Sequence, residues 1–239
     1  DGIRNAYDFA FNASGDLFTY DSDDERDISM PWYRPTRVFQ MLPGSDLGWV
    51  SRSWKRPNYS FDMPPVLGSF GRGSPTGVTC YRHTQFPAEY HGAIFALDWT
   101  YGRVLCLKLT PAGSTWRATS DVFMSGIGSH GFAPTDCDVG PDGALYVSVG
   151  GRGTRGAVYR VRAISDAPRR LPALPLDECL SAPQPLSSWS RQQWMPIAKS
   201  LGASAIRAAA EDESRPVAER VRAIEILTEM FSGVDDAMC

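Results

Sequence analysis

One unit recurs along the chain up to residue 162 and limits the possible folds more than any other feature. It consists of an inner strand, a tight turn that ends in Gly, and then an apolar residue followed by an aromatic one. The copies are FAFNASGDLFTYD (residues 9–21), VTCYRHTQFPAEYHGAIFALD (78–98) with a longer connection, and CDVGPDGALYVSV (137–149). A further strand follows each copy. Antiparallel units that repeat every roughly 40–60 residues are typical of β-propeller blades.

The rest of this region also predicts strands. Short segments rich in β-branched and aromatic residues are separated by turns with Gly, Pro, Asn and Asp. The expected strands are residues 6–12, 16–21, 37–42, 77–81, 93–99, 103–109, 121–126, 144–150 and 157–162. This makes two to three blades, whereas a propeller closes with about four to eight. We therefore expect further blades on the N-terminal side. A β-sandwich is the alternative, but it would not require the recurrent unit.

The composition changes after the strands. Residues 165–185 are rich in proline and predict an extended linker. Residues 186–239 predict helices: Ser214 is an expected helix cap and Gly233 an expected stop. The expected apolar stripe of the last helix is Val217, Val221, Ile224, Leu227 and Phe231. Two helices of this kind resemble the start of a HEAT-like repeat region, which would need a continuation to bury its stripe.

Charge and cysteine usage narrow the possible partners. The net charge of -3 gives no electrostatic reason to expect nucleic acid, and no apolar run of about 20 residues predicts a membrane span. The five cysteines include no C-x-x-C pair, which argues against a zinc site or a haem-attachment motif within this chain. Cys80, Cys106 and Cys137 lie in or beside expected strands, so we expect them to be buried.

Several separated motifs resemble one family. GIRNAYDFAFNASGDLFTYDSDDERD (2–27) and GSDLGWVS (44–51) resemble a blade of the soluble quinoprotein glucose and sorbosone dehydrogenases. Residues 73–109 and 135–161 look like the next and the closing blade. The order of segments is similar to large planctomycete-type proteins, in which HEAT repeats and a cytochrome c domain follow a propeller. The resemblance implies a mainly β fold: part of a six-bladed propeller, with about three blades in 1–164, the linker 165–185, and a HEAT-like segment in 186–239.

The same resemblance implies a cofactor site. The family binds pyrroloquinoline quinone (PQQ) with calcium beside it, and Arg4 and Asn5 match the Arg-Asn pair that contacts the quinone. Arg152, in GGRGTRG, either reaches an anionic ligand or belongs to a surface hairpin. The family's acidic loop corresponds here to Asp21, Asp23, Asp24, Glu25 and Asp27. Carboxylates are the ligands that calcium prefers, although the same residues are also common in a solvated, capped turn.

Two functions follow as hypotheses. The first is a dehydrogenase domain that oxidises sugars or aldehydes and passes electrons to a haem outside this chain, in a periplasmic or secreted protein. The second is a propeller and helical module that binds carbohydrate or protein without turnover. The chain lacks the family's Gly-Pro insertion after Asp21, the arginines near Pro134–Cys137 and a matching general-base histidine. These differences favour the second hypothesis, whereas Arg4, Asn5 and the acidic loop favour the first.

Overall fold

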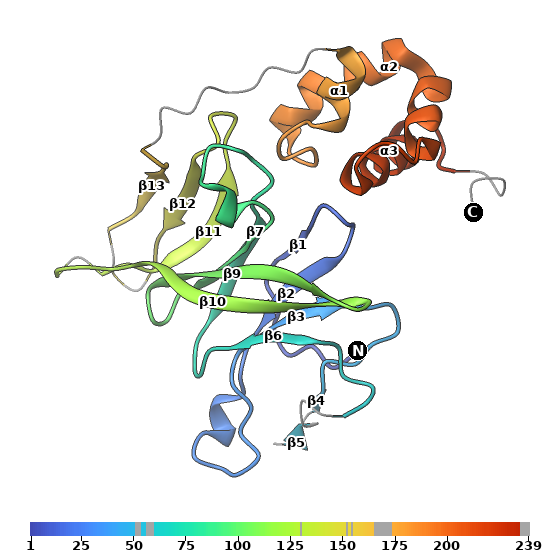
Figure 1. The fold of residues 1–239 in the computed structure, drawn as a ribbon. Helices are drawn as coiled ribbons and strands as arrows, with labels where there is room; N and C mark the ends of the chain where they lie inside the picture. The colour runs from blue at the N-terminus through green and yellow to red at the C-terminus, as the bar shows by residue number, and fades with distance from the viewer. Residues whose placement is uncertain are drawn as a thin grey trace.

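The computed structural model describes residues 1–50, 54–55, 60–129, 131–151, 153, 155–164 and 174–234. Within them the chain forms three antiparallel sheets, a two-stranded pair and three α-helices (Figure 1). The first sheet has the order β1 (Phe9–Phe11), β2 (Leu17–Asp21), β3 (Arg37–Met41), β6 (Val66–Ser69). The second is β7 (Pro75–Cys80), β8 (Ile94–Asp98), β9 (Arg103–Ala112), β10 (Thr115–Ser125), and the third is β11 (Pro134–Val139), β12 (Leu145–Val149), β13 (Ala157–Val161). The pair is β4 (Trp49–Val50) with β5 (Trp54–Lys55), and η1 (Glu25–Asp27) and η2 (Ala88–Tyr90) are short 3-10 helices.

The turn between β1 and β2 shows why the repeated unit folds as a hairpin. The Asn12 side chain accepts hydrogen bonds from the backbone N–H groups of Ser14 and Asp16, each at 2.9 Å. Gly15 has a φ of 81°, in the left-handed region that glycine enters without a steric penalty. Asn, Ser and Gly therefore close the hairpin through local chemistry.

Neighbouring sheets pack face to face. One buried cluster joins the first and second sheets through side chains such as Phe18, Tyr20 and Ile94. A second cluster joins the second and third sheets through side chains such as Phe95 and Val147. The inner strands β1, β7 and β11 lie next to one another. This is the arrangement of consecutive propeller blades, and it differs from the two facing sheets of a sandwich.

The structure confirms the mainly β character of the first part of the chain and adds strands that the sequence analysis did not predict. The strand β6 was missed because Pro64, Pro65 and Gly68 interrupt its pattern. Cys80, Cys106 and Cys137 are buried, as expected, and they are free thiols. Cys239 lies outside the described residues.

The helical segment consists of α1 (Pro175–Leu180), α2 (Ser188–Glu211) and α3 (Val217–Met230). The helix α1 lies within the segment expected to be an extended linker. Its Pro175 stands in the first turn, where a proline needs no N–H partner, and acidic Asp177 and Glu178 follow it. The remainder of the expected linker, 165–173, lies outside the described residues. Gly202 interrupts α2 with a φ of 78°, which separates two helices.

The last helix differs in detail from its prediction. Ser214 does not cap α3; its hydroxyl donates to Asp212 Oδ1 at 2.6 Å, and the helix begins after Pro216. Gly233 ends the helix as expected, because its N–H bonds to the Leu227 carbonyl at 2.9 Å and its φ is 92°. No helix within the described ranges is both long and apolar enough to cross a membrane.

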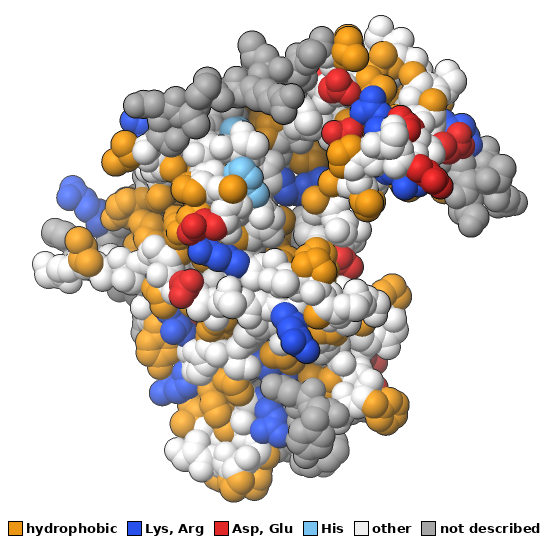
Figure 2. All heavy atoms as spheres, viewed as in Figure 1, with side chains coloured by type: hydrophobic (Ala, Val, Ile, Leu, Met, Phe, Trp, Pro, Cys, Tyr) orange, Lys and Arg blue, Asp and Glu red, His pale blue; other side chains and the backbone are white. Residues whose placement is uncertain are grey.

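The helical segment packs against the β1–β2 hairpin end of the sheets. Gln184 exchanges hydrogen bonds with the backbone of Arg82 through its own N–H and its side-chain carbonyl. The Trp189 indole donates to the Val139 carbonyl at 3.0 Å, and the Arg82 guanidinium lies 3.6 Å from Glu225 on α3. In Figure 1 the helices therefore lie at one end of the sheets, and η1 lies at the other. The face in Figure 2 is hollowed where the helices overhang the sheets.

Candidate functional site

A glycine brings the N-terminal segment to the end of β2. Gly2 has a φ of 69°, and a Cβ built on it would lie 1.9 Å from the Asp46 carboxylate. Its carbonyl accepts a hydrogen bond from Trp49 N at 2.9 Å, so the first residues run beside the segment that precedes β4. A larger residue could not approach as closely. Arg4 and Asn5 are thereby placed beside the last residue of β2.

That last residue, Asp21, fixes the Arg-Asn pair by its backbone. The carboxylate is 2% exposed. Its Oδ2 accepts from Arg4 N at 3.1 Å and its Oδ1 from Asn5 N at 2.8 Å. Hydrogen bonds to an ionised carboxylate are stronger than neutral ones. Asp21 therefore uses both oxygens to hold the backbone of Arg4 and Asn5.

The Arg4 side chain continues across the acidic loop. Its Nη1 donates to Ser22 Oγ at 2.8 Å and its Nη2 to Glu25 Oε2 at 2.7 Å. The side chains of Arg4 and Glu25 are 25% and 53% exposed. An ion pair this exposed contributes little stability, so an anionic ligand can compete with Glu25 for the guanidinium. The Asn5 residue itself is exposed.

Two further residues of the loop have partners within the protein. The Asp24 carboxylate accepts from Arg26 N at 3.2 Å and thereby caps η1. The Asp23 Oδ2 accepts a hydrogen bond from the Tyr33 hydroxyl at 2.7 Å. The expectation that Asp23 or Asp24 caps a turn is confirmed for Asp24. Tyr33 was not predicted as a partner, because no spacing in the sequence relates it to the loop.

Three carboxylate oxygens of Asp23 and Asp27 are buried and have no hydrogen-bond partner among the described residues. Both oxygens of Asp27, and Oδ1 of Asp23, have no hydrogen-bond partner in the described part of the chain. Both side chains are 0% exposed, and burial raises the pKa of the Asp23 carboxyl. Asp23 has a donor in Tyr33, whereas Asp27 has none where the structure describes the chain; a buried carboxylate without donors is costly, and a cation would remove that cost.

The geometry of these oxygens sets a limit on a calcium site. Across the described ranges, no three His, Cys, Asp or Glu side chains are grouped so that they could hold a metal ion. Asp23 and Asp27 therefore match calcium only in oxygen type and burial, and they do not form a metal site by themselves. Backbone carbonyls and water would have to supply the other ligands.

Loops of the second and third sheets meet at this same end of the inner strands. Asp98 is 0% exposed; its Oδ1 accepts from Ser74 N at 3.1 Å and its Oδ2 from Arg103 Nε at 3.0 Å. The Trp99 indole donates to Gly150 O at 2.8 Å and links the two sheets. Asp98 and Trp99 therefore hold the loops in place. Arg152, expected near an anionic ligand, lies outside the described residues.

Carboxylates of the inner strands are a feature that sequence reasoning missed. Asp8 accepts from Val78 N at 2.8 Å, which ties the start of β1 to β7. Asp136 and Asp138 are both exposed on β11. Although both residues are exposed, the surrounding protein removes part of the water around each carboxyl group and raises its pKa. The negative charge of Asp8 raises the pKa further. The alternation in TDCDV (135–139) was the available signal, since residues two apart on a strand share a face.

Comparison with solved structures identifies the fold. A protein of Thermus thermophilus, provisionally assigned as an oxidoreductase (glucose dehydrogenase), superposes with a TM-score of 0.52 and 22% identity over 66% of this chain and 45% of that one. A glucose dehydrogenase gives a TM-score of 0.52 and 20% identity over 68% and 45%. The PQQ-bound aldose sugar dehydrogenase of Streptomyces coelicolor, at a TM-score of 0.48 and 14% identity over 66% and 43%, is too distant to support an argument.

No protein-family model and no curated protein matches the sequence. The chain spans about 45% of the length of the solved structures it resembles. At these identities the likeness concerns the fold alone. The three sheets have the fold found in part of the glucose dehydrogenase propellers. In this chain, the loops that connect the strands of the three sheets meet at the Arg4 end.

Proposed function

We propose that this chain is part of a six-bladed, dehydrogenase-like propeller that oxidises sugars or aldehydes with PQQ and calcium. The single observation that carries the proposal is the anchoring of the Arg4–Asn5 backbone by Asp21 at the end where loops of the three sheets meet. The propeller fold of glucose dehydrogenases supports it. The same chemistry recurs on unrelated folds, so the residues at this end carry more weight than the fold.

The residues at this end have distinct roles in the proposal. Arg4 binds an oxygen of the cofactor in place of Glu25, because a guanidinium is a planar donor suited to carboxylate and quinone oxygens. Asp21 keeps the Arg4 backbone in position for that contact. Asp23 and Asp27 supply buried oxygens to calcium. The quinone, when bound, supplies the acceptor for the electrons of the substrate.

The inner strand of the third sheet limits how the quinone can lie. Asp136 is negative, and the family's arginines are not present at Pro134–Cys137. Carboxylates of a quinone would be repelled on that side. The contact with this chain is therefore confined to the side of Arg4.

The second candidate is a binding module without turnover. The specific observation in its favour is that Glu25 already neutralises Arg4 at 2.7 Å while Asp136 and Asp138 stay exposed. In this case the helical segment is the first part of a HEAT-like repeat and the propeller recognises carbohydrate or protein. We propose a periplasmic or secreted location for either case, with a cytochrome c domain or other electron acceptor as partner only in the first.

Dye reduction separates the two candidates. The chain is incubated with PQQ and calcium, and reduction of a redox dye is measured across a panel of aldoses and aldehydes. Arg4→Ala should abolish any reduction, whereas Arg117→Ala, at an exposed arginine of β10, should leave it unchanged. Failure of every substrate, together with absence of quinone binding, would refute the proposed oxidation and favour the binding module.

A further inference from the structure

A cleft lies at the opposite end of the inner strands from Arg4. It has a volume of about 450 Å³ and is enclosed by β1, β7, β11 and the segment that leads into α2. The hydrogen bonds between Gln184 and Arg82 hold that segment against the sheets. The cleft therefore exists only because the helical segment packs there, and none of the residues proposed for the quinone lines it.

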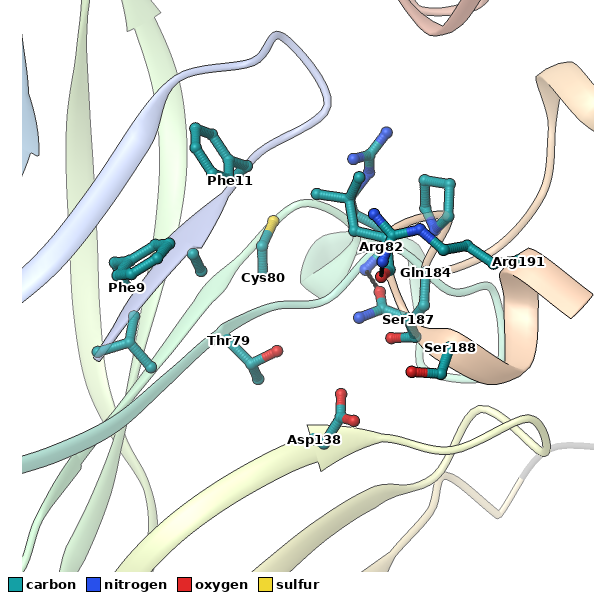
Figure 3. A pocket seen from close by; sticks show the side chains of 14 residues that line it. Phe9, Phe11, Thr79, Cys80, Arg82, Asp138, Gln184, Ser187, Ser188 and Arg191 are labelled. Carbon is teal, nitrogen blue, oxygen red and sulfur yellow. Dashed lines mark hydrogen bonds between the residues drawn. The ribbon is translucent and has the colours of Figure 1, made fainter. Parts of the chain in front are cut away.

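Polar side chains from three different elements converge in this cleft. Figure 3 shows the side chains of Thr79, Asp138, Ser187 and Ser188 pointing toward one another across it. Ser187 precedes α2 at the N-cap position, where a serine usually binds a backbone N–H of the first turn. Here its side chain makes no capping hydrogen bond. Its hydroxyl thus remains available to a ligand.

Aromatic rings form the other side of the cleft. Phe9 and Phe11 are 60% and 38% exposed, although each is a large apolar side chain. Their ring centroids are 6.1 Å apart, and the planes are nearly perpendicular, at 86°. The exposed face of the Phe9 ring therefore lies in the same cleft as the serine hydroxyls and the Asp138 carboxylate. Apolar rings beside a few convergent polar groups are the usual composition of a small-molecule site.

The charges of the cleft select against ionic ligands. Asp138 would repel an anion, whereas Arg82 and Arg191 at the rim would repel a cation. Arg191 lies 2.6 Å from Glu229, and Arg82 lies 3.6 Å from Glu225, which Arg222 also contacts at 2.9 Å, so acidic partners offset part of the positive charge at the rim. A neutral ligand with many hydroxyl groups meets these conditions. Its hydroxyls can donate to Asp138 and exchange hydrogen bonds with the serines, while its C–H face packs on a phenylalanine ring.

We propose that this cleft binds a neutral saccharide of one or two rings. Asp138 accepts hydrogen bonds from adjacent hydroxyls, Ser187 and Ser188 contact the same ring, and Phe9 packs on its apolar face. The site is separate from the Arg4 end and does not depend on the oxidation proposed above. It makes the helical segment part of a ligand site.

Direct binding to the whole chain tests the proposal without any cofactor. Glucose, N-acetylglucosamine, cellobiose and maltose are titrated by calorimetry and by saturation-transfer NMR. Asp138→Asn keeps the acceptor for Val139 N at 2.7 Å and should weaken binding about tenfold or more, the usual effect of losing hydrogen bonds to a charged group. Phe9→Ala, at an exposed residue, should also weaken binding. Asp121→Asn, an exposed carboxylate on β10, is the matched control.

The outcomes separate this proposal from the proposed function. Arg4→Ala should leave saccharide binding unchanged, so a loss there would place the binding at the other end and overturn the inference. Equal binding by the Asp138→Asn and Asp121→Asn variants would also overturn it. The inference would also be overturned if none of the four sugars binds at tens of millimolar, or if the cleft binds inorganic phosphate or putrescine and no sugar.

Discussion

The substitution Asp21→Ala tests the anchoring of the Arg-Asn pair. It removes both acceptors of the Arg4 and Asn5 N–H groups, which bond at 3.1 Å and 2.8 Å to a carboxylate that is 2% exposed. Each hydrogen bond to a charged group contributes about 1.5–3 kcal/mol. Arg4 is only half-buried, and water can partly replace its lost acceptor, so we expect a loss near the lower end of the sum, about 3 kcal/mol.

Urea unfolding and amide hydrogen exchange measure this effect. The free energy of unfolding should fall by the stated amount, and the Arg4 and Asn5 amides should lose protection while the β2–β3 amides keep theirs. Asp21→Asn retains one acceptor and should lose roughly half as much. The control Asp121→Ala changes an exposed carboxylate and should be neutral. A loss below about 1 kcal/mol, or amides that stay protected, would refute the anchoring role.

Three further predictions concern buried groups and glycines. Burial raises the pKa of Asp23 above 3.8; the folded state then holds this proton more tightly, so the free energy of unfolding falls as pH rises from 3.8 through the raised pKa. In Asp23→Asn that part of the fall should vanish from urea titrations, and an unchanged pH profile would count against it. Gly143 has a φ of 75°, and a Cβ built on it would lie 2.4 Å from His83 Nδ1, whereas Gly113 has a φ of 68° and no atom of the described residues within contact distance of such a Cβ. Gly143→Ala should therefore lower the melting temperature far more than Gly113→Ala, and equal effects would contradict the steric argument. Arg222 is 2% exposed, lies 4.3 Å from the Trp194 ring and donates a hydrogen bond to Glu225 at 2.9 Å. Arg222→Met leaves Glu225 without this partner, so the free energy of unfolding should fall by about 3 kcal/mol, and a neutral or stabilising effect in chemical unfolding would contradict this.

The sheets were predictable from the sequence because their signals are local. Alternating apolar residues and a Gly-closed turn place β1 and β2 without reference to the rest of the chain. The helix α1 was not predictable in the same way, because its prolines suggested an extended segment. The stripe of α3 was partly wrong: Val217 and Ile224 are exposed, at 71% and 41%. Arg222 is buried instead, because its guanidinium stacks over the indole ring of Trp194 on α2.

The residue types of the candidate site were predictable, but their roles were not. The motif placed Arg4 and Asn5 near the acidic loop, and the structure brings Arg4 next to Asp21 and Glu25. That Asp21 serves the backbone, while Asp27 is left with unpaired oxygens, depends on the register between segments far apart in the sequence. The polar groups of the cleft beside the helical segment come from β7, β11 and α2, and no sequence spacing links them.

Titration of PQQ into the chain at saturating calcium, by calorimetry, is the most direct measurement of the proposed role of the Arg4 end. The account predicts that the quinone binds, that Arg4→Ala weakens binding about tenfold or more, and that Arg117→Ala and Asp138→Asn bind it as the wild type does. Equal affinity of the Arg4→Ala variant and the wild type, or no binding by either, would contradict it.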